Sequence, residues 1–161
     1  MSQFKGKGTK LDEQAVCQPS NIEDLGHWKY DGEVPISTYG FIYEITNFDA
    51  GKSYIGKKQM LTVRKMPPLK GKKNKRHKTV ETDWREYTSS STQLQEDIKQ
   101  LGKDKFGFRI LQLCSCKWEL SYFEPKLQFD RNVLLSENYY NGIVNLRVGR
   151  PPKGYERNQA I

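Results

Sequence analysis

The chain has 161 residues, with 27 Lys and Arg against 19 Asp and Glu and a net charge of +8. That length suits one domain with its own hydrophobic core, and the positive charge suits a polyanionic partner without separating DNA from RNA. Three cysteines without CxxC spacing argue against a disulfide framework or zinc ribbon and favour a reducing cytoplasm. The lack of a long apolar run argues against a membrane partner, and the lack of a signal-peptide core argues against secretion.

The first 38 residues are polar and mixed in charge, and repeated Gly and Pro residues break any long periodicity. We expect residues 1–38 to form an irregular N-terminal strap that is partly disordered at its start. Trp28 and Tyr30 are available to anchor the later part of this strap against the domain.

Two short runs of β-type residues follow, at positions 41–47 and 52–56, joined by a turn of Asp, Ala and Gly. Their alternating pattern predicts a hairpin with one buried face. Tyr43 and Tyr54 lie on opposite runs, and such residues can share a face of a hairpin. Two aromatic residues packed on an edge hairpin would give the same pattern without any chemistry.

Residues 60–65 have the pattern of a short helix that Pro67 and Pro68 would stop. The stretch from 64 to 78 contains no acidic residue. It is either a solvated flexible loop or a mobile basic loop that becomes ordered on a phosphate backbone. Its basic residues are Arg64, Lys65, Lys70, Lys72, Lys73, Lys75, Arg76 and Lys78.

A helix is predicted after the Ser/Thr cluster at 88–92, with Ser91 or Thr92 as its N-cap. Leu94, Ile98 and Leu101 follow at helical spacing, and Gly102 ends the helix.

Residues 106–113 then have the pattern of a buried third strand. A second helix is predicted from 117 to about 130, with Leu120, Phe123, Leu127 and Phe129 turned inward. Pro125 either begins this helix or kinks it.

The hairpin resembles the GIY-YIG nuclease signature, with Ile42-Tyr43 in its first half and Tyr54-Ile55-Gly56 in its second. The resemblance is closest to small, phage-borne, homing-type (Seg-like) endonucleases. It implies an α/β (α+β) core over residues 39–145, in which helices flank a three-stranded antiparallel sheet in the order β-β-α-α-β-α. Residues 146–161 would form a basic C-terminal tail. Further matching residues are Arg64, Trp84, Tyr87, Glu124, Gln128, Tyr140 and Asn141.

The resemblance implies a metal-dependent endonuclease that hydrolyses phosphodiester bonds of double-stranded DNA. Glu124 would hold one Mg²⁺ or Mn²⁺ ion, whose preference is for oxygen ligands. Arg64 would stabilise charge on the phosphate. Tyr43 would act as general base or position the water, helped by cationic surroundings that lower the cost of its deprotonation. The remaining predicted catalytic residues are Tyr54, a phosphate contact, and Asn141.

Each of these residues also has a plainer interpretation. Glu124 could be an ordinary surface carboxylate, Arg64 could simply open the basic loop, and Trp84 and Tyr87 could be core residues. Where family members often carry a histidine, this chain has Pro68 and the region around Tyr87, so Tyr87 and His77 are possible auxiliary residues. His27 is given no role.

Predicted DNA contacts comprise two lysines after the hairpin, the basic loop and one arginine of the tail. Residues 148–153 loosely resemble an AT-hook, which enters narrow A·T minor grooves; alternatively, the tail packs Tyr155 against the core. A non-catalytic nucleic-acid-binding module and an RNA-structural protein are the competing functions. No protein partner is predicted. The contact set is Lys57, Lys58, Lys70, Lys72, Lys73, Lys75, Arg76, Lys78 and Arg150.

Overall fold

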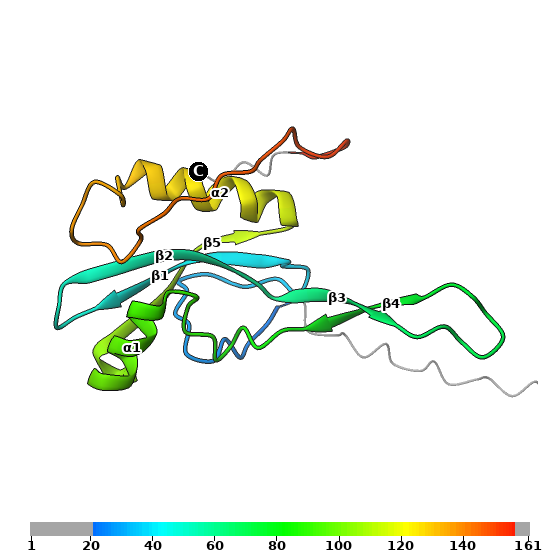
Figure 1. The fold of residues 1–161 in the computed structure, drawn as a ribbon, viewed down its shortest axis with the longest axis horizontal. Coiled ribbons are helices and arrows are strands. Elements are labelled where there is room, and N and C mark those ends of the chain that lie inside the picture. Colours follow the sequence, from blue (N-terminus) through cyan, green and yellow to red (C-terminus); the bar gives the residue numbers. More distant parts are fainter. Residues whose placement is uncertain (1–20, 157–161) are drawn as a thin grey trace, which may run out of the picture.

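The computed structural model describes residues 21–156, so the expected disordered start and the end of the expected tail lie outside the described residues. Figure 1 shows a sheet with helices on both sides and a long hairpin that projects from one end. In chain order the elements are β1 (Gly40–Asn47), β2 (Lys52–Gln59), β3 (Leu61–Met66), β4 (Arg76–Glu81), α1 (Thr92–Leu101), a short 3-10 helix (Lys103–Lys105), β5 (Phe106–Cys114) and α2 (Lys117–Asp130).

The main sheet has three antiparallel strands in the order β2-β1-β5, so β1 is central and β2 is an edge. β1 pairs with β2 in a register that places Tyr43 opposite Gly56 and Ile45 opposite Tyr54. Directly opposite residues share a face, so Tyr43 and Tyr54 lie on the same side of the sheet. The predicted hairpin, its shared tyrosine face and the third strand are confirmed. The expectation of a single buried face is wrong for β1, which is buried on both faces because it is the central strand.

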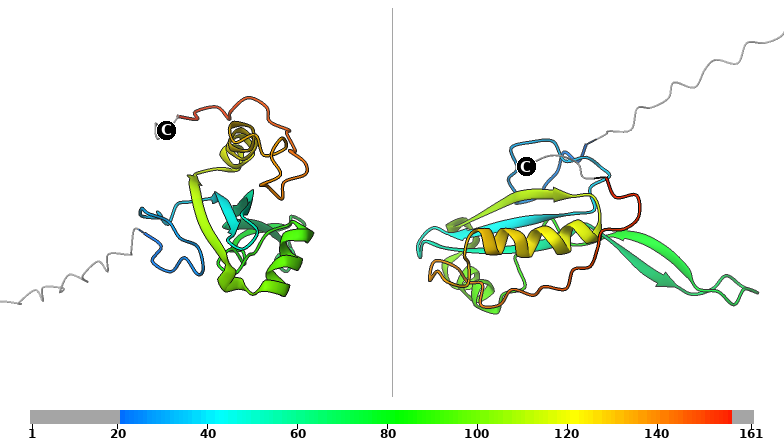
Figure 2. Two further views of the ribbon diagram at one scale, coloured as in Figure 1. Left: turned by 90° about the vertical axis from the view of Figure 1, so that its left-hand side faces the viewer. Right: turned by 90° about the horizontal axis from the view of Figure 1, so that it is seen from above.

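Each face of the sheet carries its own hydrophobic core. Under α2, Ile42 and Ile55 of the sheet pack with Leu120 and Phe123. The opposite face holds the larger cluster, which includes Tyr43, and it is covered by α1 and residues of the strap (Figures 1 and 2). This arrangement confirms the predicted three-stranded antiparallel sheet flanked by helices.

Residues 21–38 are irregular, as predicted, but they contribute to the core. Trp28 is 3% exposed, and its indole N–H donates to the backbone oxygen of Trp84 at 2.6 Å. Lys29 exchanges backbone hydrogen bonds with β5, at 2.9 Å to Phe108 and to Ile110. Trp28 is therefore an anchor, as expected, and Tyr30 packs at the margin of the same cluster.

The helix predicted at residues 60–65 is wrong, and so is a loop over the whole of residues 64–78, since both ends of that stretch are paired strands. Residues 61–66 and 76–81 form a two-stranded antiparallel ribbon, β3–β4, which extends β2 beyond the main sheet (Figure 2). Strand pairing is favoured by the β-branched pair Thr62 and Val63, and Pro67 and Pro68 end a strand as readily as a helix. We call residues 61–81 the arm.

Both predicted helices are present. Ser91 caps α1 by accepting from the Leu94 N–H, and Gly102 closes it with a bond to Ile98 at 3.1 Å, as expected. Leu101 is nevertheless 44% exposed, whereas Leu94 and Ile98 pack on the core.

α2 begins at Lys117 and contains Pro125, so the alternative in which the helix starts at Pro125 is wrong. Phe129, expected inside, is 54% exposed. Within residues 21–156, no helix has the length and apolar character needed to cross a bilayer.

Candidate active site

A pocket of about 450 Å³ opens at the outer edge of β2. Three residues predicted for one site, Tyr54, Glu124 and Asn141, line it together, and so does the predicted DNA contact Lys57. They come from β2, α2 and the segment after α2, so the fold gathers them from distant parts of the chain. The other lining residues are Ser90, Ser91, Gln128, Tyr140, Gly142, Ile143 and Asn145.

The two signature tyrosines lie over Gly56. Their ring centroids are 6.2 Å apart. A Cβ atom on Gly56 would come within 2.6 Å of the Tyr43 hydroxyl and 2.8 Å of Cε1 of Tyr54. The glycine of the signature is therefore required for space, because both rings occupy the volume that any side chain would need.

Tyr43 and Tyr54 differ in their access to the pocket. Tyr54 lines it, with its hydroxyl 3.4 Å from Oγ of Ser90, whereas Tyr43 is 1% exposed and lies beneath. Burial, with smaller contributions from the phenols of Tyr87 and Tyr54, raises the pKa of Tyr43 well above 10. The expectation that cationic surroundings lower this pKa is wrong, because Tyr43 is buried among uncharged rings that include Trp28, Tyr54 and Tyr87.

Glu124 forms an ion pair across the pocket with Lys57, at 2.9 Å between Oε2 and Nζ. It is the only carboxylate among the residues that line the pocket. No group of three or more His, Cys, Asp or Glu residues suited to a metal ion occurs within residues 21–156. A Mg²⁺ ion nevertheless fits this donor set, since Mg²⁺ is often held by one or two carboxylates and completes its shell with water and substrate phosphate.

Asn141 fastens the segment after α2 to the edge of β2. Its Oδ1 accepts from the Ile55 N–H at 3.0 Å, and its Nδ2 donates to the Ile55 carbonyl at 2.8 Å. Gln128 of α2 donates to the same carbonyl at 2.9 Å. The amide of Asn141 thus imitates a backbone pairing, and it holds the strand, the helix and the following segment around the pocket.

The adjacent Tyr140 is fixed on the other side of the pocket. Its hydroxyl donates to Oδ2 of Asp97 on α1 at 2.7 Å and accepts from Asn47 of β1 at 2.8 Å. Hydrogen bonds from Tyr140 and Asn141 therefore tie the wall of the pocket to α1 and to the sheet.

Other predicted residues lie elsewhere. Arg64 is exposed on β3 and does not line the pocket, contrary to its expected place on a helix beside the site. His77 is exposed on β4, opposite Lys65. Lys58 lies over the ring of Tyr87 at 3.7 Å and forms an ion pair with Asp83 at 2.6 Å.

Two of the plainer interpretations hold. Trp84 is a core residue with no exposed surface, while Tyr87 is half-buried against Tyr43, with ring centroids 6.1 Å apart. In the tail, the Tyr155 hydroxyl donates to Glu119 at 2.8 Å, so Tyr155 packs on α2. Arg150 of the tail is exposed.

A second pocket of about 330 Å³ adjoins the first and shares Lys57 and Asn145 with it. Ser121 and Arg147 also line it, which adds a cation and a hydroxyl beside the ion pair. Sequence reasoning did not find Ser90, Asn145 or Arg147. Ser90 belongs to the Ser/Thr cluster before α1, where capping explains the composition, and Asn145 and Arg147 reach the two pockets only through the course of the chain after α2.

An α+β core with two adjacent tyrosines over a glycine, beside a pocket with one carboxylate, is the arrangement expected of the GIY-YIG class. Residues 27–144 match the family model described as "Putative endonuclease segE, GIY-YIG domain". The match covers well over half of the chain, so the protein belongs to this family. GIY-YIG domains are nucleases, so the substrate is a nucleic acid. Comparisons with curated proteins and with solved structures gave no match.

Proposed function

We propose that the protein is a homing-type, phage-borne endonuclease that hydrolyses phosphodiester bonds of double-stranded DNA with the help of a divalent metal ion, in a reducing cytoplasm. The observation that carries this proposal is the ion pair of Glu124 and Lys57 beside Tyr54 in one pocket. A module that only binds nucleic acid gains nothing from a carboxylate in that position, since it repels phosphate.

Glu124 is the residue that would hold the metal ion. Bound there, Mg²⁺ or Mn²⁺ would polarise a phosphate oxygen and lower the pKa of a coordinated water. The Glu124 side chain is 16% exposed and the Lys57 side chain 40%. Lys57 therefore neutralises a partly buried carboxylate in the free protein, and its long, more exposed side chain is available to a phosphate oxygen when substrate binds.

The phenol of Tyr54 is the hydroxyl best placed to contact the phosphate or the attacking water, because it lines the pocket. Tyr43 would then act through Tyr54 as a positioning residue, since its own hydroxyl is buried. Asn141 holds the pocket wall through Ile55. We assign the neutralisation of phosphate charge to Lys57 in place of Arg64.

The test compares Glu124→Gln with Glu96→Gln, which makes the same change on an exposed position of α1. Each protein is incubated with supercoiled plasmid in Mg²⁺ and in chelator, and binding is measured separately in chelator. We expect wild type and Glu96→Gln to cut only with metal. Glu124→Gln should lose at least about 100-fold in single-turnover rate, a typical cost for a catalytic group, while binding DNA equally or more tightly because a negative charge is gone.

Normal cutting by Glu124→Gln would overturn the assignment of Glu124. If the wild-type protein binds duplex DNA but cuts none with Mg²⁺ or Mn²⁺, the alternative of a non-catalytic binding module is supported instead.

A further inference from the structure

The excess positive charge of the protein is concentrated in the arm. Eight Lys and Arg residues and no Asp or Glu lie between positions 64 and 78, and the other 19 basic residues of the chain are equal in number to its 19 acidic residues. The polyanion-binding character inferred from composition is thus a property of this segment, which projects from the body of the protein (Figure 1).

The two faces of the arm differ. Opposite residues share a face, and β3 and β4 pair with Arg64 opposite Lys78 and Met66 opposite Arg76. One face, which we call the reading face, therefore carries three of the four Lys and Arg residues of the strands. It consists of Thr62, Arg64, Met66, Arg76, Lys78 and Val80, whereas the opposite face consists of Leu61, Val63, Lys65, His77, Thr79 and Glu81.

Nothing within the described residues compensates the charge of the reading face. Arg64 and Lys78 are direct cross-strand neighbours, an arrangement that destabilises a ribbon by repulsion. None of the basic residues from 64 to 78 has an ion pair with a described residue. A two-stranded ribbon without a packed face is only marginally stable in water. A polyanion that lies on the reading face would remove the repulsion between its basic residues and so stabilise the ribbon.

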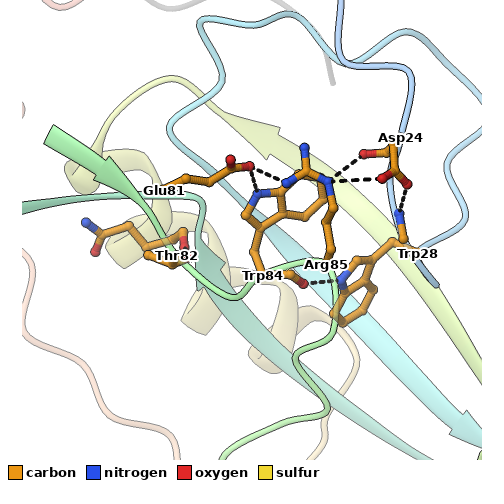
Figure 3. A network of polar contacts seen from close by, with 8 residues as sticks. Asp24, Trp28, Glu81, Thr82, Trp84 and Arg85 are labelled. Carbon is orange, nitrogen blue, oxygen red and sulfur yellow. Dashed lines mark hydrogen bonds and ion pairs between the residues drawn. The ribbon is translucent and has the colours of Figure 1, made fainter.

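The root of the arm is held in place by a network of polar contacts (Figure 3). Arg85 binds Glu81 at the end of β4 and reaches the strap, where its Nε donates to the Asp24 carbonyl at 2.9 Å. The indole N–H of Trp84 donates to Glu81 at 2.7 Å, and Thr82 donates through its backbone N–H to Met60 at 2.9 Å.

These contacts fix the direction in which the arm leaves the sheet. The Trp84 indole, with the Arg85 guanidinium, also lowers the pKa of the Glu81 carboxyl, so the network stays charged through the neutral range. An arm that only needed to hold phosphates could be a flexible loop. A ribbon whose root is fixed is suited to a partner surface that has a fixed shape.

We propose that the arm enters the major groove of duplex DNA and reads base edges with its reading face, while the loop lysines at its tip contact phosphates. This inference rests on the proposed function, which supplies duplex DNA as the substrate. The major groove admits a two-stranded β-ribbon. A strand of six residues spans about 20 Å, the rise of about six base pairs at 3.4 Å each.

The side chains of the reading face suit that groove. Arginine forms paired hydrogen bonds with the O6 and N7 atoms of guanine, and apolar groups contact the methyl group of thymine. Arg64 and Arg76 provide the first chemistry, and Met66, which neighbours both of them on this face, provides the second. The deep, narrow major groove of an RNA duplex would exclude the arm.

The experiment selects binding sites from a pool of random duplex DNA in chelator, so that the DNA stays intact. Lys78→Gln and Lys65→Gln make the same charge change in adjacent cross-strand pairs of the ribbon but on opposite faces. We expect wild type and Lys65→Gln to select the same consensus sequence. Lys78→Gln should lose positions from it and bind the wild-type consensus about 5- to 150-fold more weakly, the range of a base contact.

Two further measurements separate groove reading from phosphate binding. Methylation of guanine N7 within the consensus should block binding of the wild-type protein. The double variant Lys72→Gln/Lys73→Gln, in the loop, should reduce the slope of log binding constant against log salt concentration by about 0.9 for each phosphate that it no longer neutralises. The same variant should select the wild-type consensus. Because the four substituted lysines are exposed, all variants should melt close to the wild-type temperature.

The proposal is overturned if the wild-type protein selects no consensus, if Lys65→Gln and Lys78→Gln behave alike, if guanine methylation has no effect, or if RNA duplex competes better than DNA. Such results leave the proposed nuclease function intact when plasmid is still cut with Mg²⁺. Conversely, a consensus that follows the reading face in a protein that never cuts refutes the nuclease function alone.

Discussion

Replacement of Gly56 by alanine tests whether the signature glycine is needed to make room for the two tyrosines. The new Cβ would lie 2.6 Å from the Tyr43 hydroxyl, 2.7 Å from its Cζ and 2.8 Å from Cε1 of Tyr54. Ordinary carbon contacts are about 3.5–4.0 Å, so one ring or both must move by about 1 Å. Tyr43 cannot retreat freely, because the Trp28 ring lies behind it with centroids 4.9 Å apart.

We expect Gly56→Ala to cost about 1–3 kcal/mol of stability, the usual penalty for an overpacked core. With a urea slope of about 2 kcal/mol per molar, a loss of about 2 kcal/mol lowers the unfolding midpoint by about 1 M. Displacing the Tyr54 hydroxyl by about 1 Å should also slow single-turnover cutting about 100-fold, even in conditions where the variant is fully folded.

Gly149→Ala is the matched control, since no atom lies within 4 Å of its added Cβ and its backbone is outside the left-handed region. It should unfold within about 0.5 kcal/mol of the wild type and cut normally. The steric reasoning is refuted if Gly56→Ala unfolds at the wild-type urea concentration, and the link to catalysis is refuted if a folded Gly56→Ala protein cuts at the wild-type rate.

Two further predictions concern single side chains. Burial, followed by the nearby Lys103, lowers the pKa of His27 from 6.5 to about 4. As the pH falls, His27 therefore binds a proton in the unfolded chain before it does so in the folded protein, and the free energy of unfolding should decrease between about pH 6.5 and pH 4. His27→Phe should reduce this pH-dependent loss of unfolding free energy by about 1–2 kcal/mol, whereas His77→Gln, on the exposed arm, should not. Identical pH profiles of stability for the wild type and both variants would contradict the burial argument. Tyr54→Phe removes only a hydroxyl at the pocket, so it should leave the melting temperature nearly unchanged and slow single-turnover cutting by about 10²–10⁴, while Tyr122→Phe on α2 should cut normally; an unaffected rate in Tyr54→Phe would return this tyrosine to a packing role.

Much of the core could be predicted from local patterns. The alternation around Tyr43 places Phe41, Tyr43 and Ile45 on one face of β1, and a one-residue slip would move all three to the face under α2. Ser91 and Gly102 mark both ends of α1 because capping satisfies backbone groups that the helix leaves free. Each of these signals depends only on residues that are close together in the chain, so it can be recognised from the sequence alone.

The arm could not be predicted in this way. Thr62 and Val63 favour a strand only weakly, and β-propensity depends on what lies opposite. The partner strand begins ten residues after β3 ends, beyond a loop with two prolines. At the root of the arm, Arg85 joins β4 to the strap, and such a contact has no local signature.

The candidate site was predictable in part. Tyr54, Glu124 and Asn141 were found because they match a family pattern, and they do meet at one pocket. The pattern could not show that Tyr43 is buried beneath Tyr54, or that Glu124 is already paired with Lys57. Both facts follow from side-chain packing between residues that are more than ten positions apart in the chain.

The contact between Trp28 and Trp84 has a consequence for how the protein can be divided. A fragment that began at the signature, near residue 39, would lack Trp28 and Val34, which belong to the cluster that surrounds Tyr43. A buried tryptophan covers about 150–250 Å², worth about 4–6 kcal/mol at about 25 cal/mol per Å², against a total stability of about 5–15 kcal/mol for most domains. The smallest unit that folds and cuts therefore begins ahead of Trp28, and a graft of the signature hairpin with its two helices onto another protein must carry the strap with it.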